Sequence, residues 1–225
     1  MATEPDANPE PRIPLSKERV LRAAISLADE GGIEALTMRK LAQELGVEAM
    51  SLYYHVDNKD DILDGIVDTV VSEIDLPSKK TDWKTAIRQS AISAHDVLLR
   101  HPWACRLMLS HTRVLLGRLR YMDSLLAALR EGGFSPEMTH HAYHALDSHI
   151  MGFTLWEASF TFAAEDLPKL GATFLQELPT GEYPYLVEHV EQHLKESSQE
   201  EEGEFEFGLD LILDGLERIL QRLER

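Results

Sequence analysis

Histidines are concentrated in one short segment of the chain, where His140, His141, His144 and His149 accompany Asp147. Residues four apart share one face of a helix, so His140 and His144 could chelate Zn²⁺, Ni²⁺ or Cu²⁺ if a third ligand completed the site. The segment lacks the further spacing constraints that identify a metal motif. Unmetallated histidines at a surface or an interface are commoner. We therefore expect no functional metal here, and the role of the cluster stays open.

Residue types that support covalent catalysis are present but poorly placed. Ser110 and His111 are adjacent, and adjacent helical side chains point about 100° apart, so these two do not form a nucleophile and its base. The sequence contains neither a G-x-S-x-G elbow nor a glycine-rich phosphate loop. Cys105 lies in the run WACRLM and is expected to be a small buried hydrophobe. We predict no enzymatic activity and no cofactor.

A stronger binding signal lies between Leu36 and Leu63, in elements that would position side chains for DNA. Thr37 suits a helix start, because its hydroxyl can accept a free amide of the first turn. Leu41 and Leu45 then repeat at i and i+4 on one face. Gly46 predicts the end of this helix, since glycine readily adopts the left-handed conformation that a tight turn needs.

A second short helix is expected directly after this turn, from about Glu48 to Tyr54, with Leu52 and Val56 directed inward. Asn58 is expected to cap a third helix, with Asp61 three residues on as in a capping box. Two short helices joined by a glycine turn are the arrangement that places a recognition helix in the DNA major groove.

The residues of this segment closely resemble the TetR family of bacterial repressors. The matching strings are TMRKLA from Thr37, LGV from Leu45, LYYHV from Leu52, and the pair Asn58 and Lys59. Upstream, VLRAA and GGIEAL look like the first helix of that family and the loop after it. The resemblance covers about Ser16 to Ile66, and the tetracycline-repressor branch looks nearest.

The resemblance implies a set of DNA contacts. Positions that contact phosphates in the family are matched by Thr37, Arg39, Tyr53, His55 and Lys59. Positions that face bases are matched by Ser51 and Tyr54, and Lys40 is a further cation of the motif. Ala49 and Met50 replace a polar residue and a proline of the tetracycline repressor. Neither can make a bidentate hydrogen bond to a base, so we expect a different operator, with apolar contacts to thymine methyl groups.

Composition limits how such a protein could bind DNA. The 225 residues carry a formal net charge of −17, which is unusual for a protein that binds a polyanion. Residues 1–60 hold 7 Lys and Arg against 11 Asp and Glu, a net charge of −4. Non-specific DNA affinity should therefore be modest. One cysteine fits a reducing cytoplasm, and no apolar run long enough for a membrane span occurs, so we expect a cytoplasmic protein without a membrane partner.

The whole chain is predicted to be all α. Residues 1–15 are proline-rich and read as a disordered arm, residues 16–60 as the DNA-binding domain, and residues 61–225 as a ligand-binding and dimerisation domain. A helix from Lys59 to Leu76 should connect the two. Further helices are expected at 83–99, 112–130, 136–163, 185–196 and 205–223, with a short segment at 103–109 and a broken connection at 165–184.

The last helix carries a broad apolar stripe with spacings of three and four. Its predicted interface residues are Leu209, Ile212, Leu213, Leu216, Ile219 and Leu220. Packing within the chain's own core is one interpretation. The resemblance favours another, in which this helix and the 136–163 helix pair with their copies in a homodimer. A two-fold pair is also expected because helix-turn-helix proteins gain affinity and site length by dimerising.

A small-molecule inducer is implied by the resemblance, and helix-bounded pockets are lined mainly by apolar and aromatic groups. The candidate lining residues are His95, Trp103, Met108, His111, Phe153, Trp156, Glu157 and Phe160. Aligned on the family, the magnesium-binding histidine of the tetracycline repressor falls near Met108, and a tetracycline-contacting histidine falls near Asp75. A thioether is a poor Mg²⁺ ligand, so tetracycline with magnesium is improbable as the inducer.

The sequence thus predicts a homodimeric, ligand-responsive repressor that a small molecule releases from a palindromic operator. Two alternatives remain. One is a DNA-binding helical protein without an effector, which the additional helical domain disfavours. The other is a small-molecule-binding helical protein with a non-functional helix-turn-helix, which the presence of Arg39, Tyr53, His55 and Lys59 disfavours.

Overall fold

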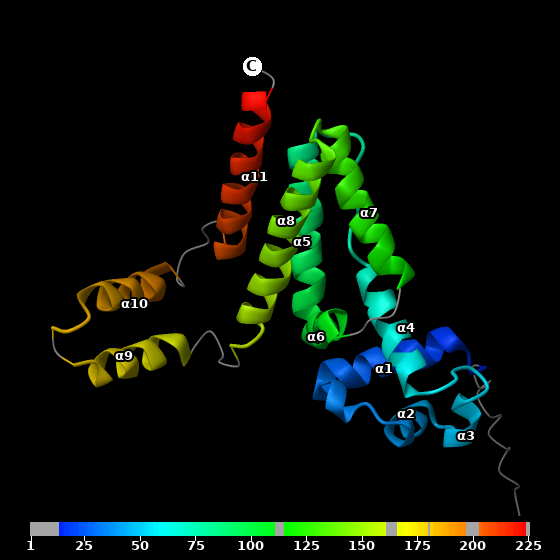
Figure 1. Ribbon diagram of the computed structural model, residues 1–225. Helices are drawn as coiled ribbons and strands as arrows, with labels where there is room; N and C mark the ends of the chain where they lie inside the picture. Colours follow the sequence, from blue (N-terminus) through cyan, green and yellow to red (C-terminus); the bar gives the residue numbers. More distant parts are fainter. Residues whose placement is uncertain (1–13, 111–114, 161–165, 180, 197–202, 224–225) are drawn as a thin grey trace, which may run out of the picture. The chain divides into compact units, whose positions relative to one another are not determined.

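The computed structural model describes residues 14–110, 115–160, 166–179, 181–196 and 203–223 (Figure 1). Over these ranges the chain is helical, with eleven α-helices, one short 3-10 helix and no strand. This confirms the all-α prediction. The chain divides into two compact units: unit 1 takes the described residues of Met1–Glu73 and Trp103–Arg120, and unit 2 those of Ile74–Pro102 and Tyr121–Arg225.

Unit 1 is built around the predicted helix-turn-helix. Its elements are α1 (Lys17–Gly31), η1 (Ile33–Ala35), α2 (Met38–Leu45), α3 (Ala49–Leu52), α4 (Lys59–Val71), α6 (Pro102–Ser110) and the start of α7 (Leu116–Glu131). The caps expected at Thr37 and Asn58 are confirmed, and Ser16 caps α1 in the same way: the side chains of Ser16, Thr37 and Asn58 accept hydrogen bonds from the amides of Arg19, Lys40 and Asp61. These bonds satisfy amides that a helix start otherwise leaves free.

Unit 2 is a bundle of longer helices. It contains α5 (Trp83–Arg100), the remainder of α7, α8 (Pro136–Glu157), α9 (Leu167–Glu177), α10 (Pro184–Glu196) and α11 (Glu204–Leu223). Helices α5, α8 and α11 pack on one another, and α9 packs on α10. The centre of the α5–α8–α11 packing is apolar, with Ile87, Leu146, Leu209 and Leu213 fully buried. Burial of such side chains contributes about 1.5–3 kcal/mol each.

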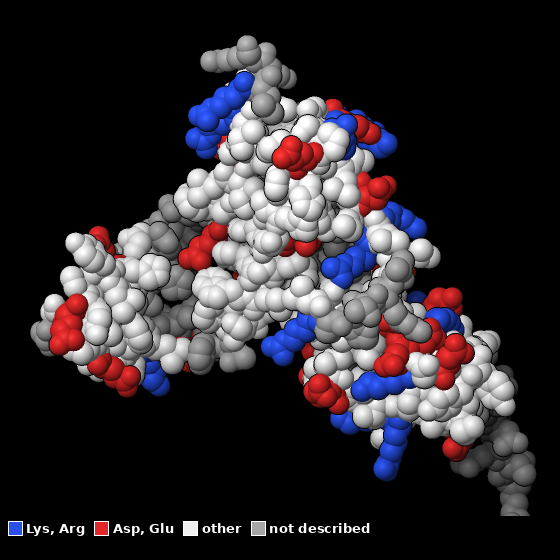
Figure 2. Space-filling view, viewed as in Figure 1, with Lys and Arg blue, Asp and Glu red and all other residues white. Residues whose placement is uncertain are grey.

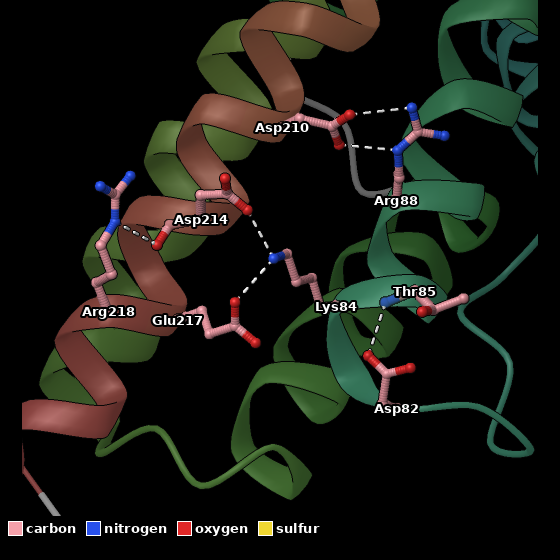
Figure 3. A network of polar contacts seen from close by, with 8 residues as sticks. All are labelled: Asp82, Lys84, Thr85, Arg88, Asp210, Asp214, Glu217 and Arg218. Atoms are coloured by element: carbon pink, nitrogen blue, oxygen red, sulfur yellow. Dashed lines mark hydrogen bonds and ion pairs between the residues drawn. The ribbon is translucent and has the colours of Figure 1, made fainter.

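Ion pairs line one side of the contact between α5 and α11 (Figure 3). Arg88 donates from Nε and Nη2 to the two carboxylate oxygens of Asp210, at 2.8 and 3.1 Å. Lys84 Nζ reaches Asp214 Oδ1 at 2.6 Å and Glu217 Oε2 at 2.8 Å. These pairs raise the pKa of Lys84 and lower that of Asp214. The acidic side of α11 is therefore matched to the basic side of α5.

Four predicted helices have wrong boundaries, and one predicted connection is wrong. Helix α3 is Ala49–Leu52 rather than about Glu48–Tyr54, and α7 begins at Leu116 rather than at residue 112. Helix α4 ends at Val71 rather than Leu76. The backbone amides of Ser72 and Glu73 close its final turn by donating hydrogen bonds to the carbonyls of Asp68 and Val70. Helix α8 ends at Glu157 rather than Ala163. The connection expected at 165–184 contains the helix α9, whose Pro168 lies in the first turn, where a missing amide costs no hydrogen bond.

The predicted domain boundary at residue 60 remains a prediction. Compactness groups α4 with α1, on which it packs, whereas the prediction assigned α4 to the second domain. Helix α6 also belongs to unit 1, where the Trp103 indole Nε1 donates to Asp29 Oδ1 of α1 at 2.7 Å. Among the described residues, no helix is long and apolar enough to span a membrane.

Candidate DNA-binding site and ligand-binding region

The turn between α2 and α3 has the geometry of a helix-turn-helix. Gly46 lies in the left-handed region, with φ 66° and ψ 35°, and its amide bonds back to carbonyls of α2. A side chain at this φ would be strained, so glycine is the residue that this turn requires. Leu41, Leu52 and Val56 are buried beneath the two helices. The apolar face thereby fixes which side chains of α3 point to solvent.

The predicted DNA-contacting residues lie at or near the surface of this motif. Thr37, Arg39, Lys40, Tyr53, Tyr54 and Lys59 are exposed, and Ser51 and His55 are half-buried. Tyr54 and Met50 are 87% and 73% exposed, so neither side chain packs in the apolar core of its unit. Exposed apolar and aromatic groups beside a recognition helix are suited to stacking and methyl contacts in a groove.

The charge of this surface is carried by single cations. Arg39, Lys40 and Lys59 form no ion pair with any described residue, whereas Lys17 Nζ lies 3.1 Å from Asp61 Oδ1. The visible side of unit 1 shows isolated basic side chains among acidic ones rather than a continuous basic surface (Figure 2). Phosphate contacts would therefore come from a few defined positions, as the net charge of the sequence suggested.

The predicted ligand-binding residues fall in both units. Trp103 and Met108 are buried on α6 in unit 1, while His111 lies outside the described residues. The others are in unit 2, on α5, on α8 and in the turn after α8: His95, Phe153, Trp156, Glu157 and Phe160. Trp103 is predicted to line a pocket, and in the structure its indole N–H donates a hydrogen bond to the Asp29 carboxylate.

The unit 2 residues of this set form one aromatic cluster around His95. Its Nδ1 is 2.8 Å from Thr154 Oγ1, and its Nε2 is 3.2 Å from Glu157 Oε2. The imidazole stacks on Phe205, with ring centroids 3.9 Å apart and planes 4° from parallel. Burial lowers the pKa of His95, and the nearby Glu157 carboxylate opposes this by raising it.

The cluster continues along α8 as edge-to-face pairs. Phe153 and Trp156 have centroids 5.2 Å apart, and Trp156 and Phe160 4.7 Å. Trp156 and Phe160 are about half exposed, at 48% and 49%. Sequence reasoning missed Thr154 and Phe205. No pattern in the sequence pointed to either, because Phe205 joins the cluster from α11, far along the chain.

The predicted dimer residues do not all face outward. Leu209, Leu213 and Leu216 are buried within this chain, at 0%, 0% and 7% exposure, so a partner does not reach them. This corrects their assignment to an intermolecular surface: the stripe is broad enough that one edge packs on α5 and α8. Ile212 and Leu220 are half-buried, and Ile219 is 39% exposed.

The histidines of α8 are close to one another but do not form a metal site. His140, His141 and His144 are exposed, with ring centroids 5.4 Å apart for the first pair and 4.6 Å for His140 and His144. In the part of the chain that the structure describes, no group of three or more His, Cys, Asp or Glu side chains could hold a metal ion.

Two short helices across a left-handed glycine, with unpaired cations and exposed aromatic side chains on the open face, define a helix-turn-helix DNA-binding protein. Comparison with known families is more specific. Residues 20–66 match the model described as "Bacterial regulatory proteins, tetR family", and residues 76–220 match "Tetracyclin repressor-like, C-terminal domain". The chain belongs to the TetR family and is a ligand-responsive, DNA-binding transcriptional repressor.

Similar proteins support this over nearly the whole chain. It is 31% identical to the tetracycline repressor protein class D of Escherichia coli, over 90% of this chain and 89% of that protein. It is 30% identical to the HTH-type transcriptional repressor DrrR1 of Streptomyces coeruleorubidus, over 95% and 80%. The crystal structure of ActR from Streptomyces coelicolor in complex with (S)-DNPA superposes with a TM-score of 0.70 and 30% identity, covering 92% and 98%. These relatives are transcriptional regulators rather than enzymes.

Proposed function

We propose that this protein acts in the cytoplasm as a homodimer, binds a two-fold symmetric operator through α2 and α3 of each subunit, and is released by a small molecule bound in its C-terminal part. The observation that carries the proposal is the helix-turn-helix surface itself, which exposes Met50, Tyr53 and Tyr54 and also the cations Arg39, Lys40 and Lys59. Large apolar side chains that are exposed together mark a surface that binds another molecule.

The proposed DNA contacts divide into two kinds. Thr37, Arg39, Lys40, Tyr53, His55 and Lys59 contact phosphates, and Ser51 and Tyr54 contact bases. Phosphate contacts add affinity to every sequence, whereas base contacts discriminate between sequences. The apolar pair Ala49 and Met50 adds contacts to thymine methyl groups, which present an apolar surface in the major groove.

An operator selected from a random duplex library tests this division. We expect a palindrome that contains T·A pairs opposite Met50. Met50→Gln should change the preference at those pairs while leaving the phosphate-dependent affinity for other sequences unchanged. A matched control is Glu48→Gln, which alters the exposed residue before α3 without changing an apolar contact. Failure to select any sequence would contradict the proposed function.

The proposed dimer surface is the open side of α8 and α11. Phe207 and Leu211 are 64% and 56% exposed, although they lie on the otherwise well-packed α11. Small residues accompany them: nothing lies within 4 Å of a Cβ built on Gly152 of α8 or Gly215 of α11. Helices that present small residues can approach closely, and apolar side chains beside them then become buried.

Replacing Leu211 by Glu tests this surface without touching the core of the subunit. A charge there would have to be desolvated on dimerisation, at a cost of several kcal/mol. We expect a folded monomer by analytical ultracentrifugation, with operator affinity reduced by more than about tenfold because one half-site alone is held. The conservative variant Leu211→Met should remain dimeric. A Leu211→Glu protein that stays dimeric would place the interface elsewhere.

The proposed effector site uses the aromatic cluster in unit 2, with Phe153, Trp156 and Phe160 for contact and His95 and Glu157 for orientation. The assignment of Trp103, Met108 and His111 to a ligand stays a prediction from the sequence. Tetracycline with magnesium is not the proposed ligand, since Met108 offers a buried thioether where a hard oxygen or nitrogen ligand would be needed.

Release would follow from a change in the spacing of the two recognition helices, which must lie about 34–36 Å apart to enter successive major grooves. Helix α4 directly follows the helix-turn-helix in the chain and is the element proposed to move. A 100-fold release requires about 2.7 kcal/mol of coupling, and operator DNA must then weaken the ligand by the same factor. Titrating a ligand found by thermal shift, with and without operator, measures this coupling. Equal affinities would exclude it.

A further inference from the structure

We propose that unit 2 contains a second small-molecule site, separate from the aromatic cluster around His95, and that it takes an organic cation with an aromatic or aliphatic body. The site is a cavity of about 510 Å³ between the loop that precedes α5, the first turn of α5 and the end of α7. Ligand pockets in proteins have volumes of about 300–1,000 Å³. None of the residues proposed for the effector site lines this cavity.

Four of the residues that line the cavity are small. They are Ala86 on α5, Ala127 and Ala128 on α7, and Gly132 directly after α7. Larger side chains at these positions would fill the space, as they do in an ordinary helix contact. Because no larger side chain fills this space, methyl groups and backbone line this part of the cavity, which suits the apolar part of a ligand.

Trp83 forms a fixed aromatic wall of the cavity. A Cβ built on Gly132 would lie 2.6 Å from Trp83 Cγ, so the indole lies directly against the glycine backbone. On another side its ring meets Phe134 edge to face, with centroids 4.9 Å apart. The indole is therefore held in place before any ligand arrives, which reduces the entropy lost on binding.

The charged residues of the lining give the cavity its selectivity. The lining contains three carboxylates, Asp82, Asp123 and Glu131, and one cation, Lys79. Lys79 Nζ is 3.9 Å from Glu131 Oε1, and both of these side chains are largely exposed. Such an exposed pair is weak, so an incoming ammonium can replace the lysine at Glu131. Asp82 stays ionised, because backbone hydrogen bonds at the start of α5 lower its pKa.

An ammonium group is the ligand chemistry that fits this arrangement. Carboxylates attract it, and the face of a tryptophan adds a cation–π attraction. Within the described part of the chain Asp123 forms no hydrogen bond or ion pair, so its carboxylate is available without breaking an internal contact. The same carboxylates would repel an anion of the same shape.

Two probes with the same aromatic body and opposite charge test the proposal. Phenethylamine and phenylacetate are titrated into the full-length protein by calorimetry at about 0.15 M salt, where long-range attraction to the acidic protein is screened. We expect phenethylamine to bind with a Kd of about 1 mM or tighter, as its size allows. Phenylacetate should bind at least tenfold more weakly. Equal affinities, or no binding of phenethylamine, would overturn the proposal.

Substitutions locate the binding. Asp123→Asn should weaken phenethylamine several-fold, and Ala128→Leu should abolish it by filling the cavity. Glu188→Gln, which neutralises an exposed carboxylate on α10, is the matched control and should leave the affinity unchanged. The indole N–H resonance of Trp83, assigned with Trp83→Phe, should shift on titration. Binding that neither Asp123→Asn nor Ala128→Leu weakens would contradict the assignment. The titration uses no DNA, so its outcome is independent of the operator experiments.

Discussion

In unit 1, Arg39, Lys40 and Lys59 extend into solvent without ion pairs, whereas in unit 2 Lys84 and Arg88 are bound to carboxylates of α11. Both groups of cations lie at the start of helices or on helix faces. They differ in whether a carboxylate of the same chain forms an ion pair with them. A cation held in an internal pair contributes to helix packing and is not available to a phosphate. In a chain of net charge −17, these three side chains remain accessible to an external anion.

The two units also differ in how they expose apolar side chains. In unit 1, Met50 and Tyr54 project from the helix-turn-helix above a buried layer. In unit 2, Phe207 and Leu211 project from the opposite edge of a helix whose Leu213 is buried. Within α11, the buried residues stabilise the subunit, and the exposed residues are accessible to another molecule.

The largest expected effect comes from a charge in the core of unit 2. Leu213→Asp should destabilise the protein by several kcal/mol or prevent folding, because a fully buried carboxylate lacks a partner there. Leu211→Asp, two residues away on the exposed side, should still fold and should lose only the stabilisation that dimerisation adds. Urea unfolding followed by circular dichroism measures both. Similar losses for the two variants would show that the two edges of α11 are not different.

A tenfold effect on DNA binding is expected from the unpaired cations. Lys59→Ala should weaken operator and non-operator DNA about equally and reduce the slope of log Kobs against log salt by about 0.9. Thermal stability should not change, since Lys59 makes no internal ion pair. Fluorescence anisotropy over a salt series measures the slope. An unchanged slope would remove Lys59 from the phosphate contacts.

The paired cations should behave in the opposite way. Arg88→Ala leaves Asp210 without its partner and should lower the free energy of unfolding by about 1 kcal/mol, a modest amount because the pair is about one-third exposed. Non-operator DNA affinity should not fall. Arg88→Lys should restore part of the stability but not the two-point contact with Asp210. A loss of DNA affinity in Arg88→Ala without a loss of stability would contradict the division between the two groups.

The smallest effect is a pH dependence at His95. Burial lowers its pKa in the folded state, with Glu157, Asp96 and Glu206 opposing and His149 adding to the reduction. The unfolded state therefore takes up a proton first, at a pKa of about 6.5, and stability falls as pH drops below that value toward the lower folded pKa. His95→Gln should make stability less dependent on pH between about 7 and 5. Thermal unfolding at several pH values measures the slope, and an identical slope in the variant would exclude His95 as its source.

Prediction from sequence succeeded where structure depends on neighbouring residues. The caps at Ser16, Thr37 and Asn58 and the glycine turn at Gly46 are set by side chains acting within four positions. Helix ends without such signals were placed less well: α4 stops at Val71, although the apolar pattern of the sequence continues. The helix at Leu167–Glu177 was not predicted, because Pro168, Pro179 and Pro184 together indicate breaks over residues 165–184.

What the sequence alone determined about this protein is its all-α class, its helix-turn-helix and its family, because capping, turn conformation and helical periodicity are local. Tertiary structure decided which side of α11 is buried, since Leu209 and Leu211 differ only in what α5 and α8 bring against them. It also decided that His95 stacks on Phe205 and that Arg88 holds Asp210. Such contacts join residues more than a hundred positions apart, and their energies come from burial and charge pairing that no single helix contains.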